Sequence, residues 1–366
     1  MTKAAVCREI GQPLEVVDVE VDAPHAGEVK IRLAASGVCH SDLSVQNGTL
    51  LQPIPAVLGH EGAGIIEEVG EGVTDLKVGD HVVISWVPQD GTCFYCTHDQ
   101  PELCESGLLA MMTGGLIDGT SRFTENGVPV LQMASTGTFS EVTVVPAISA
   151  IKIRDDMPLP QAALIGCGVL TGFGAAANTA DIKPGDTVAV VGCGGVGLNV
   201  IQGAKHMKAA TIIAVDKMDH KLEMAKQFGA THTVNAGDGD PVAKVLELTE
   251  GRGADHTFEV IGYTATIEQA YNMARRGGET IIVGVPDMEA NFPTNGFGIV
   301  FGEKTIKGSW YGSSDVHRDI PRYVELYQKG ELLLDELISR KIDLTGVNEA
   351  FAAMGSGEVA RSVITY

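Results

Sequence analysis

A glycine-rich turn between an apolar run and a helical stretch constrains the fold of this chain most strongly. Residues 187–191 predict a buried strand, and Gly192, Gly194 and Gly197 follow it at the start of a helical stretch that extends through Lys208. The spacing alone is weak evidence, because the 366 residues include 45 glycines. Its place between strand and helix makes it a specific dinucleotide-binding signal: the glycines permit a tight turn, close approach of a pyrophosphate and close packing of helix on strand.

An aspartate ends the next predicted strand. Residues 211–215 form an apolar run, and Asp216 follows Gly197 by nineteen residues. A carboxylate there accepts hydrogen bonds from the ribose of NAD and repels the 2′-phosphate of NADP, although a strand-end aspartate can also be merely exposed. Gly195 and Val196 complete a helix start whose unpaired N–H groups suit phosphates. We therefore predict an NAD site.

The segment after the glycine turn alternates strands with helices. Further strands are predicted at 231–234, 257–261 and 280–283, with helices at 219–228 and 241–249. This alternation is typical of an α/β fold with a doubly wound parallel sheet.

The earlier part of the chain has a different pattern. Short β-type runs at 28–33, 63–69 and 81–84 lie between turn signals, and residues 93–140 lack a clear period. We expect a mainly β, barrel-like domain with a lobe and a long loop in the last region. The tail predicts an amphipathic helix at 322–329 and a final strand. A chain of this length is expected to form two domains.

Charge and cysteine content limit the partners and the compartment. The 26 basic and 47 acidic residues give a net charge of −21, which argues against nucleic acid or an anionic membrane as partner. No signal peptide is expected. Residues 160–180 carry no charge but contain four glycines, which favours a buried helix at a domain junction. The odd cysteine count of seven predicts free thiols in a reducing cytoplasm.

Three dispersed residues form a candidate metal site. Cys39, His60 and Cys167 each lie in a segment flanked by glycine. Singly, a buried cysteine usually packs as a small hydrophobe, and a histidine beside a glutamate is usually a satisfied polar pair. Two thiolates and one imidazole together make a catalytic zinc site with an open fourth position. We predict zinc.

With the glycine turn and Asp216, these segments resemble the zinc-dependent medium-chain alcohol dehydrogenases over nearly the whole chain. The resemblance implies a GroES-like catalytic domain at 1–168 and 311–366, interrupted by a Rossmann NAD-binding domain at 169–310. It also implies a small-molecule alcohol or aldehyde substrate and a homodimer or homotetramer.

The resemblance also implies roles for residues near the first ligand. Ser41 would accept the alcohol proton first, and Asp42 and Glu61 would tune the metal site. Relatives place a relay histidine where this chain has Ser44, so that His40 or water would end the relay here. His40 also stands where relatives carry a phosphate-binding side chain.

The resemblance also implies roles for residues that would contact the cofactor and the substrate. Lys221 would contact the adenosine ribose, Arg361 would pair with the pyrophosphate, and Thr171 and Val196 would pack on the nicotinamide. An apolar pocket would suit a primary, aryl or allylic alcohol; simple core packing is the alternative for its expected lining residues, Trp86, Leu50 and Leu109.

A second metal site is implied by the four-cysteine lobe of the relatives. Cys93, Cys96 and Cys104 match its last three positions, and Asp90 stands at the first. Zinc accepts carboxylate oxygen, so we predict a structural Cys₃Asp zinc site; the alternative is a lobe without metal.

Three other functions stay open. S-(hydroxymethyl)glutathione dehydrogenase ranks second, because residues 45–52 lack the acidic side chains of that branch. A nicotinoprotein would hold NAD permanently, and a non-catalytic scaffold would keep only the fold. The three zinc ligands argue against a zinc-free branch or a relic.

Overall fold

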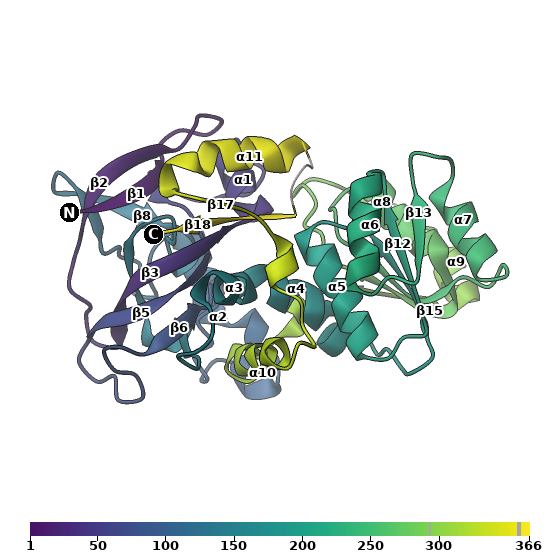
Figure 1. The fold of residues 1–366 in the computed structure, drawn as a ribbon, viewed down its shortest axis with the longest axis horizontal. Helices are drawn as coiled ribbons and strands as arrows, with labels where there is room; N and C mark the ends of the chain where they lie inside the picture. The colour runs from purple at the N-terminus through teal and green to yellow at the C-terminus, as the bar shows by residue number, and fades with distance from the viewer. Residues whose placement is uncertain (293, 357–359) are drawn as a thin grey trace. The chain divides into compact units, whose positions relative to one another are not determined.

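The structure is a computed structural model that describes residues 1–292, 294–356 and 360–366. The chain divides into two compact units. One unit comprises residues 1–168 and 315–366, and the other comprises residues 169–314. The second unit is therefore inserted into the first along the sequence (Figure 1).

A closed barrel forms part of the first unit. Its strand order is β1-β2-β7-β8-β4, with bounds β1 Thr2–Cys7, β2 Glu15–Val21, β7 Phe123–Glu125, β8 Val128–Gln132 and β4 Ala56–Val57. Its interior is apolar and includes the fully buried side chains of Val19, Val57 and Phe123. β7 and β8 lie where a loop was predicted, because strands of three and five residues are too short to show a period.

A seven-stranded sheet carries the residues of interest in the first unit. Its order is β10-β6-β5-β3-β18-β17, with β9 also paired to β3. The bounds are β3 Glu28–Val38, β5 Glu61–Val69, β6 His81–Ile84, β9 Val142–Pro146, β10 Ala150–Lys152, β17 Ile338–Ile342 and β18 Arg361–Thr365. The last strand, β18, lies between β3 and β17 (Figure 1). The pairs Gly37↔Glu61 and Val38↔Ser362 bring β5 and β18 to the end of β3, just before Cys39.

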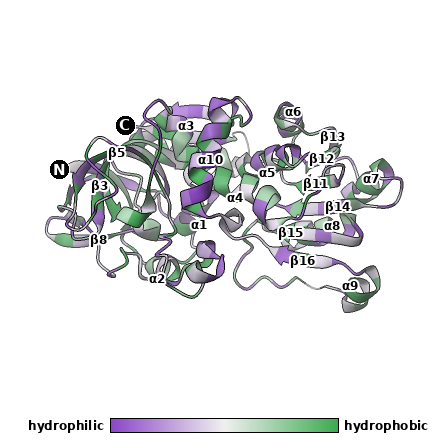
Figure 2. Ribbon diagram, turned by 90° about the horizontal axis from the view of Figure 1, so that it is seen from below, coloured by the Kyte–Doolittle hydropathy of each residue, from purple (hydrophilic) through white to green (hydrophobic). Residues whose placement is uncertain are grey.

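Helices flank these sheets in the first unit: α1 His40–Asn47, α2 Glu105–Thr113, α3 Leu159–Leu164, α10 Val316–Gln328 and α11 Val347–Ser356. Short 3₁₀ turns occur at Cys96–His98, Pro101–Leu103, Met133–Ser135, Ala147–Ser149, Asp335–Leu337 and Leu344–Gly346. The predicted helix at 322–329 begins earlier in the structure, because Asp315 caps α10 by accepting from His317 N and Arg318 N and the helix continues through Pro321. Polar and apolar colours alternate along α10, as in an amphipathic helix (Figure 2).

The second unit is a parallel sheet with the strand order β13-β12-β11-β14-β15-β16. The bounds are β11 Thr187–Val191, β12 Thr211–Asp216, β13 His232–Asn235, β14 Ala254–Glu259, β15 Ala274–Ile282 and β16 Thr305–Gly308. In chain order this is 3-2-1-4-5-6, the doubly wound arrangement, which reverses direction between β11 and β14. The predicted α/β class is confirmed.

Helices connect these strands: α4 Leu170–Gly174, α5 Gly195–His206, α6 Asp219–Phe228, α7 Pro241–Leu248, α8 Thr264–Met273 and α9 Gly296–Gly302, with a 3₁₀ turn at Tyr311–Ser313. Among the described residues, Leu159–Thr179 is the one helical segment long and apolar enough to cross a membrane by composition, and 78% of its most apolar window is buried. Two stretches of this segment, Ile165–Val169 and Ala175–Thr179, are π-helical. The first contains Cys167.

Candidate active site and a second cysteine cluster

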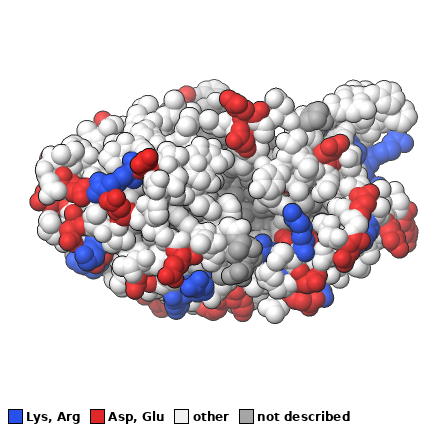
Figure 3. Space-filling view, turned by 90° about the horizontal axis from the view of Figure 1, so that it is seen from above, with Lys and Arg blue, Asp and Glu red and all other residues white. Residues whose placement is uncertain are grey.

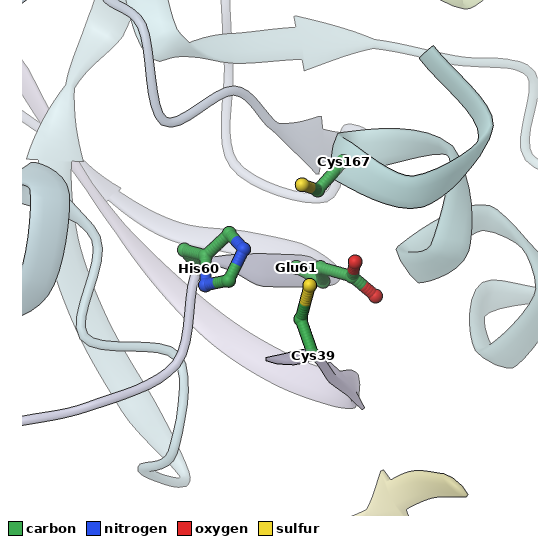
Figure 4. Close-up of side chains that lie close together, drawn as sticks. All are labelled: Cys39, His60, Glu61 and Cys167. Carbon is green, nitrogen blue, oxygen red and sulfur yellow. The ribbon is translucent and has the colours of Figure 1, made fainter. Parts of the chain in front are cut away.

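Four buried side chains converge in the first unit, from β3–α1, β5 and the π-helical turn. We call them the buried cluster: Cys39, His60, Glu61 and Cys167. Their ligand atoms all lie within 4.8 Å of one another. The two sulfurs and the imidazole face a common space (Figure 4). Segments that are distant in sequence therefore bring the three predicted zinc ligands together.

The local structure around Cys39 orients His60. Cys39 caps the N-terminus of α1, and its backbone N–H donates to Asp42 Oδ2 at 2.9 Å. The other oxygen, Asp42 Oδ1, lies 2.8 Å from His60 Nδ1. A carboxylate at one ring nitrogen fixes the ring and leaves Nε2 for a metal, which is the usual arrangement of a metal-binding histidine. Asp42, predicted to tune the site, is in contact with a predicted ligand.

A tight turn places His60 at the start of β5. Gly59 has φ +90°, which L side chains rarely adopt, and a Cβ there would lie 2.5 Å from the ring and backbone of Phe139. Glycine is therefore required at this position for both its conformation and its lack of a side chain.

Glu61 is paired with an arginine from the last strand. Arg361 Nη2 lies 3.0 Å from Glu61 Oε1, and the two side chains are 6% and 0% exposed. Gly168 N donates to the same oxygen at 3.2 Å, and a Cβ on Gly168 would lie 1.8 Å from Arg361 Nη2. We predicted a pyrophosphate contact for Arg361; its pairing with Glu61 was not foreseen, because nothing in the sequence links two residues so far apart.

Mutual contacts shift the pKa values in the buried cluster. A hydrogen bond with Cys167 lowers the pKa of Cys39 well below its usual value, and the same bond raises the pKa of Cys167. Burial lowers the pKa of His60, but Asp42 outweighs it and raises the value overall. Burial raises the pKa of Glu61 to about 7 against the opposing charge of Arg361. The cluster therefore favours thiolate character at one cysteine.

The residues predicted to relay protons lie on or next to α1. Ser41 Oγ is 3.9 Å from Cys39 Sγ, and Ser41 and Ser44 are partly buried. His40 is exposed. Only Ser41 of these three therefore has a described side-chain contact with the buried cluster.

Two of the three predicted pocket residues pack against the same apolar core. The Trp86 ring meets the His60 ring edge-on, with centroids 6.3 Å apart. Trp86 and Leu50 pack against one apolar core that includes Val45 and Leu58. Leu109 is absent from that core; it lies on α2 and is 53% exposed. The structure therefore places an aromatic and apolar surface beside His60, but it does not bring Leu109 there.

Another group of potential ligands lies in the first unit near residues 90–106. We call it the lobe cluster: Asp90, Cys93, Cys96 and Cys104. Its ligand atoms also lie within 4.8 Å of one another, and only Cys104 is fully buried. Four ligands around a tetrahedral zinc are about 3.8 Å apart for Zn–S bonds of about 2.3 Å. The spacing is therefore compatible with the predicted site.

A third group, His25, Glu28 and Asp118, has the same ligand spacing but already holds a cation. Arg122 Nη2 lies 2.6 Å from Glu28 Oε1 and 2.8 Å from Asp118 Oδ2. Because the guanidinium neutralises both carboxylates, we do not assign this group to a metal.

The predicted cofactor residues lie in the second unit. Gly192 has φ +99°, and a Cβ on Gly197 would lie 1.8 Å from Gly192 O, so that both positions need glycine. Asp216 Oδ2 accepts from Cys193 N at 2.8 Å, which joins the end of β12 to the glycine turn. The other residues predicted to contact the cofactor, namely Thr171, Val196, Lys221 and the helix-opening pair Gly194 and Gly195, are described in or near α4, α5 and α6. Their contacts with a cofactor stay predictions.

Comparisons with known proteins agree with this architecture. The alcohol dehydrogenase GroES-like domain matches residues 25–155, and the zinc-binding dehydrogenase domain matches residues 195–329. The fold and the cluster therefore define a GroES-like and Rossmann-type dehydrogenase. The chain belongs to the zinc-dependent medium-chain alcohol dehydrogenase family.

Individual relatives match over the full length. The NDMA-dependent alcohol dehydrogenase of Amycolatopsis methanolica is 41% identical, with 100% of this chain and 99% of that protein covered. The S-(hydroxymethyl)glutathione dehydrogenase of Synechocystis is also 41% identical, with 100% of both covered. The crystal structure of benzyl alcohol dehydrogenase from Acinetobacter calcoaceticus matches with a TM-score of 0.94 and 32% identity, covering 100% of this chain and 99% of that one. The resemblance found in the sequence is confirmed.

Proposed function

We propose that this protein is an NAD-dependent zinc alcohol dehydrogenase acting on primary, aryl or allylic alcohols and the corresponding aldehydes. The observation that carries the proposal is the convergence of Cys39, His60 and Cys167 within 4.8 Å in a buried site. The donor set fits zinc, since it offers two thiols and an imidazole whose Nδ1 is already fixed by Asp42.

The chain's own residues prepare the site for this chemistry. Zinc held by the three ligands would supply a Lewis acid that lowers the pKa of an alcohol hydroxyl or polarises a carbonyl. Asp42 fixes His60, and Arg361 balances the charge of Glu61. Ser41, beside Cys39, is the first acceptor for the alcohol proton. His40 is exposed to water and can pass the proton on, because Ser44 cannot take the role of the relay histidine.

The second unit supplies the redox partner. NAD would accept the hydride that the alcohol carbon loses. Gly192, Gly194 and Gly197 would hold its pyrophosphate at the start of α5, and Asp216 its ribose. The bond from Cys193 N to Asp216 Oδ2 positions that carboxylate beside the turn.

The substrate class rests on the surface beside His60. Trp86 is edge-on to His60, Leu50 packs against the same apolar core as Trp86, and residues 45–52 carry no acidic side chain. This favours an aryl alcohol over a charged glutathione adduct, which we keep as the second candidate because one full-length relative has that name.

The proposal is tested by incubating the purified protein with NAD and a panel of primary, aryl and allylic alcohols and following absorbance of NADH. Oxidation of an aryl alcohol faster than of S-(hydroxymethyl)glutathione is expected. No turnover with any alcohol contradicts the proposal. Turnover with a dye acceptor, with NAD retained through dialysis, identifies a nicotinoprotein instead, an activity in keeping with the name of the NDMA-dependent relative.

We also propose a cytoplasmic homodimer or homotetramer. The seven cysteines are all free, which suits a reducing compartment. Phe297, Val300 and Phe301 on α9 are 71%, 83% and 64% exposed. Large apolar side chains exposed together commonly mark a protein interface. On the face drawn in Figure 3, acidic side chains are spread among neutral ones and basic groups form no large patch. Analytical ultracentrifugation measures the assembly state.

A further inference from the structure

The second unit contains a buried carboxylate that takes no part in the proposed chemistry. Glu259 is the last residue of β14, and its side chain is fully buried. Its register partner on β11 is Val191, the residue just before Gly192 of the glycine turn. Glu259 therefore lies one strand away from the predicted dinucleotide site, but its burial keeps it from touching a ligand.

The carboxylate of Glu259 holds the turn that follows β14. Its Oε1 accepts from Ile261 N at 2.9 Å, from Gly262 N at 2.9 Å and from Thr266 Oγ1 at 2.7 Å. Gly262 N also lies 3.1 Å from Oε2. Because Thr266 belongs to the first turn of α8, this one side chain joins the end of the strand, the turn and the start of the helix.

The described hydrogen-bond partners of this carboxylate are neutral N–H and O–H groups. Burial raises the pKa of Glu259, and hydrogen bonds from Thr266, Gly262 and Ile261 oppose the rise. A buried carboxylate destabilises a fold unless hydrogen bonds compensate for the lost water. A strand end that served only for packing would need no such group, so the carboxylate points to a role for the turn that it holds.

The turn after β14 lies against the glycine turn. A Cβ on Gly192 would lie 2.6 Å from Ile261 Cγ1, so the two turns are in close contact. The main-chain oxygen of Glu259 accepts from Val283 N at 2.8 Å and from Gly284 N at 3.0 Å, which adds the segment after β15. Ligands of a doubly wound sheet bind at the carboxyl ends of the strands, where its order reverses, here between β11 and β14. Glu259 therefore orders the chain at that edge.

We propose that Glu259 is a positioning residue for NAD, whose carboxylate fixes residues 260–263 against the glycine turn before the cofactor binds. The inference rests on the proposed NAD-dependent function. A turn that is already ordered loses less conformational entropy on binding, so the effect is expected on cofactor affinity. Hydride transfer should be unaffected, because a fully buried side chain does not touch the reacting atoms.

The test compares the purified full-length parent with Glu259→Ala and Glu259→Gln. The Kd for NAD is measured by calorimetry without alcohol, and kcat is measured with an aryl alcohol at saturating NAD. Glu259→Ala leaves the N–H groups of the turn without their acceptor, so the Kd should rise about 10-fold while kcat stays near that of the parent. Glu259→Gln keeps an amide oxygen in the place of Oε1 and should restore most of the affinity.

Asp255→Asn is the matched control. Asp255 lies near the other end of β14, where it accepts from Thr187 N at 2.8 Å and from Arg275 Nε at 2.5 Å. Its replacement should lower stability in urea without changing the Kd for NAD. Hydrogen exchange without NAD gives a second readout, because amides 261–263 should exchange faster in Glu259→Ala than in Asp255→Asn.

Either of two results would overturn the inference: equal Kd values for NAD in Glu259→Ala and Asp255→Asn, or equal exchange of amides 261–263 in these two variants. If Glu259→Ala folds poorly, Thr266→Val removes one donor and should raise the Kd about 3-fold; an unchanged Kd would then contradict the inference. A parent that binds no NAD would contradict the proposed function together with this inference. A parent that binds NAD as tightly as its Glu259 and Thr266 variants would contradict this inference alone.

Discussion

The buried cluster and the lobe cluster are built from similar parts but treat their carboxylates differently. Each combines three nitrogen or sulfur ligands with one acidic side chain. In the buried cluster Arg361 balances the charge of Glu61. In the lobe cluster Asp90 has neutral donors, Thr92, Cys93 and Ser106. A carboxylate that keeps its charge suits a metal ligand, whereas a carboxylate already paired with a guanidinium does not need the metal.

With zinc in both clusters as predicted, this contrast would separate a site open for substrate from a site closed by protein. Three protein ligands leave the fourth zinc position open, as catalysis requires, whereas four ligands complete a structural site. In the group His25, Glu28 and Asp118, the guanidinium of Arg122 supplies the positive charge that a metal would otherwise supply. The partner of each carboxylate thus separates the clusters: neutral donors hold Asp90, whereas guanidinium groups pair with Glu61, Glu28 and Asp118.

The largest effect is expected from loss of a ligand in the buried cluster. Cys39→Ala or His60→Ala should reduce alcohol oxidation to background, because two remaining ligands hold zinc poorly. NAD should still bind, since the glycine turn belongs to the other compact unit. Turnover is measured by NADH absorbance, and NAD binding by calorimetry. Cys96→Ala is the control that should retain turnover. Alcohol oxidation by Cys39→Ala or His60→Ala would exclude the zinc mechanism.

Removal of the guanidinium should have the next largest effect, on stability. Arg361→Leu removes the positive partner of the buried Glu61, and loss of one member of a buried pair should cost about 3–5 kcal/mol in the free energy of unfolding. The measurement is urea denaturation. Adding Glu61→Leu should recover much of the loss. Lys3→Ala, which breaks the exposed pair between Lys3 and Asp18, should cost at most about 1 kcal/mol. Equal losses in the two single variants would contradict the view that Arg361 balances Glu61.

A smaller effect is expected in the second unit. Asp216→Ala removes an acceptor and a negative charge, so NAD should bind about 10-fold more weakly and NADP should no longer be excluded. Kd values for both cofactors provide the measurement, with exposed Asp238→Ala as a control. If the parent already uses NADP as well as NAD, the assignment of Asp216 is wrong.

The smallest effect concerns the cluster occupied by Arg122. Burial raises the pKa of Asp118, but hydrogen bonds from Thr120 and Arg122 outweigh it and lower the value to about 2. A lowered folded pKa adds stability above the ordinary value near 4, and this contribution disappears as pH falls from about 4 to about 2. Because Asp118 is 48% exposed, the contribution should stay below about 1 kcal/mol.

The comparison of Asp118→Asn with the parent tests this contribution. The stability difference between the two proteins, measured by urea denaturation, should be constant above pH 5 and shrink toward pH 2. A difference that grows on acidification would show that the pKa is not lowered.

The sequence predicted the elements whose signals are local. A buried strand followed by a glycine turn and a helix identified the parallel sheet. Glycine-flanked segments that match those of the family singled out Cys39, His60 and Cys167, which the structure brings together. The resemblance to the four-cysteine lobe of the relatives also grouped Asp90 with three cysteines, and the structure brings these four together.

Other features depend on contacts between distant segments, which local patterns do not encode. The pairing of Arg361 with Glu61 follows from the position of β18 beside β3. The donation from Ser106 to Asp90 depends on how α2 returns to the lobe. The early start of α10 was missed because proline usually ends a helix, whereas here Asp315 starts the helix ahead of Pro321.

The position of β18 also has a consequence for biosynthesis. It lies inside the seven-stranded sheet, yet it consists of Arg361–Thr365, which leave the ribosome after the whole inserted unit. Domains generally fold as units while the chain is being made. The inserted unit, residues 169–314, is complete before this strand emerges. The sheet of the first unit must therefore wait until the inserted unit and β18 have been made, and until then β3 and β17 lack their shared neighbour and Glu61 lacks its arginine.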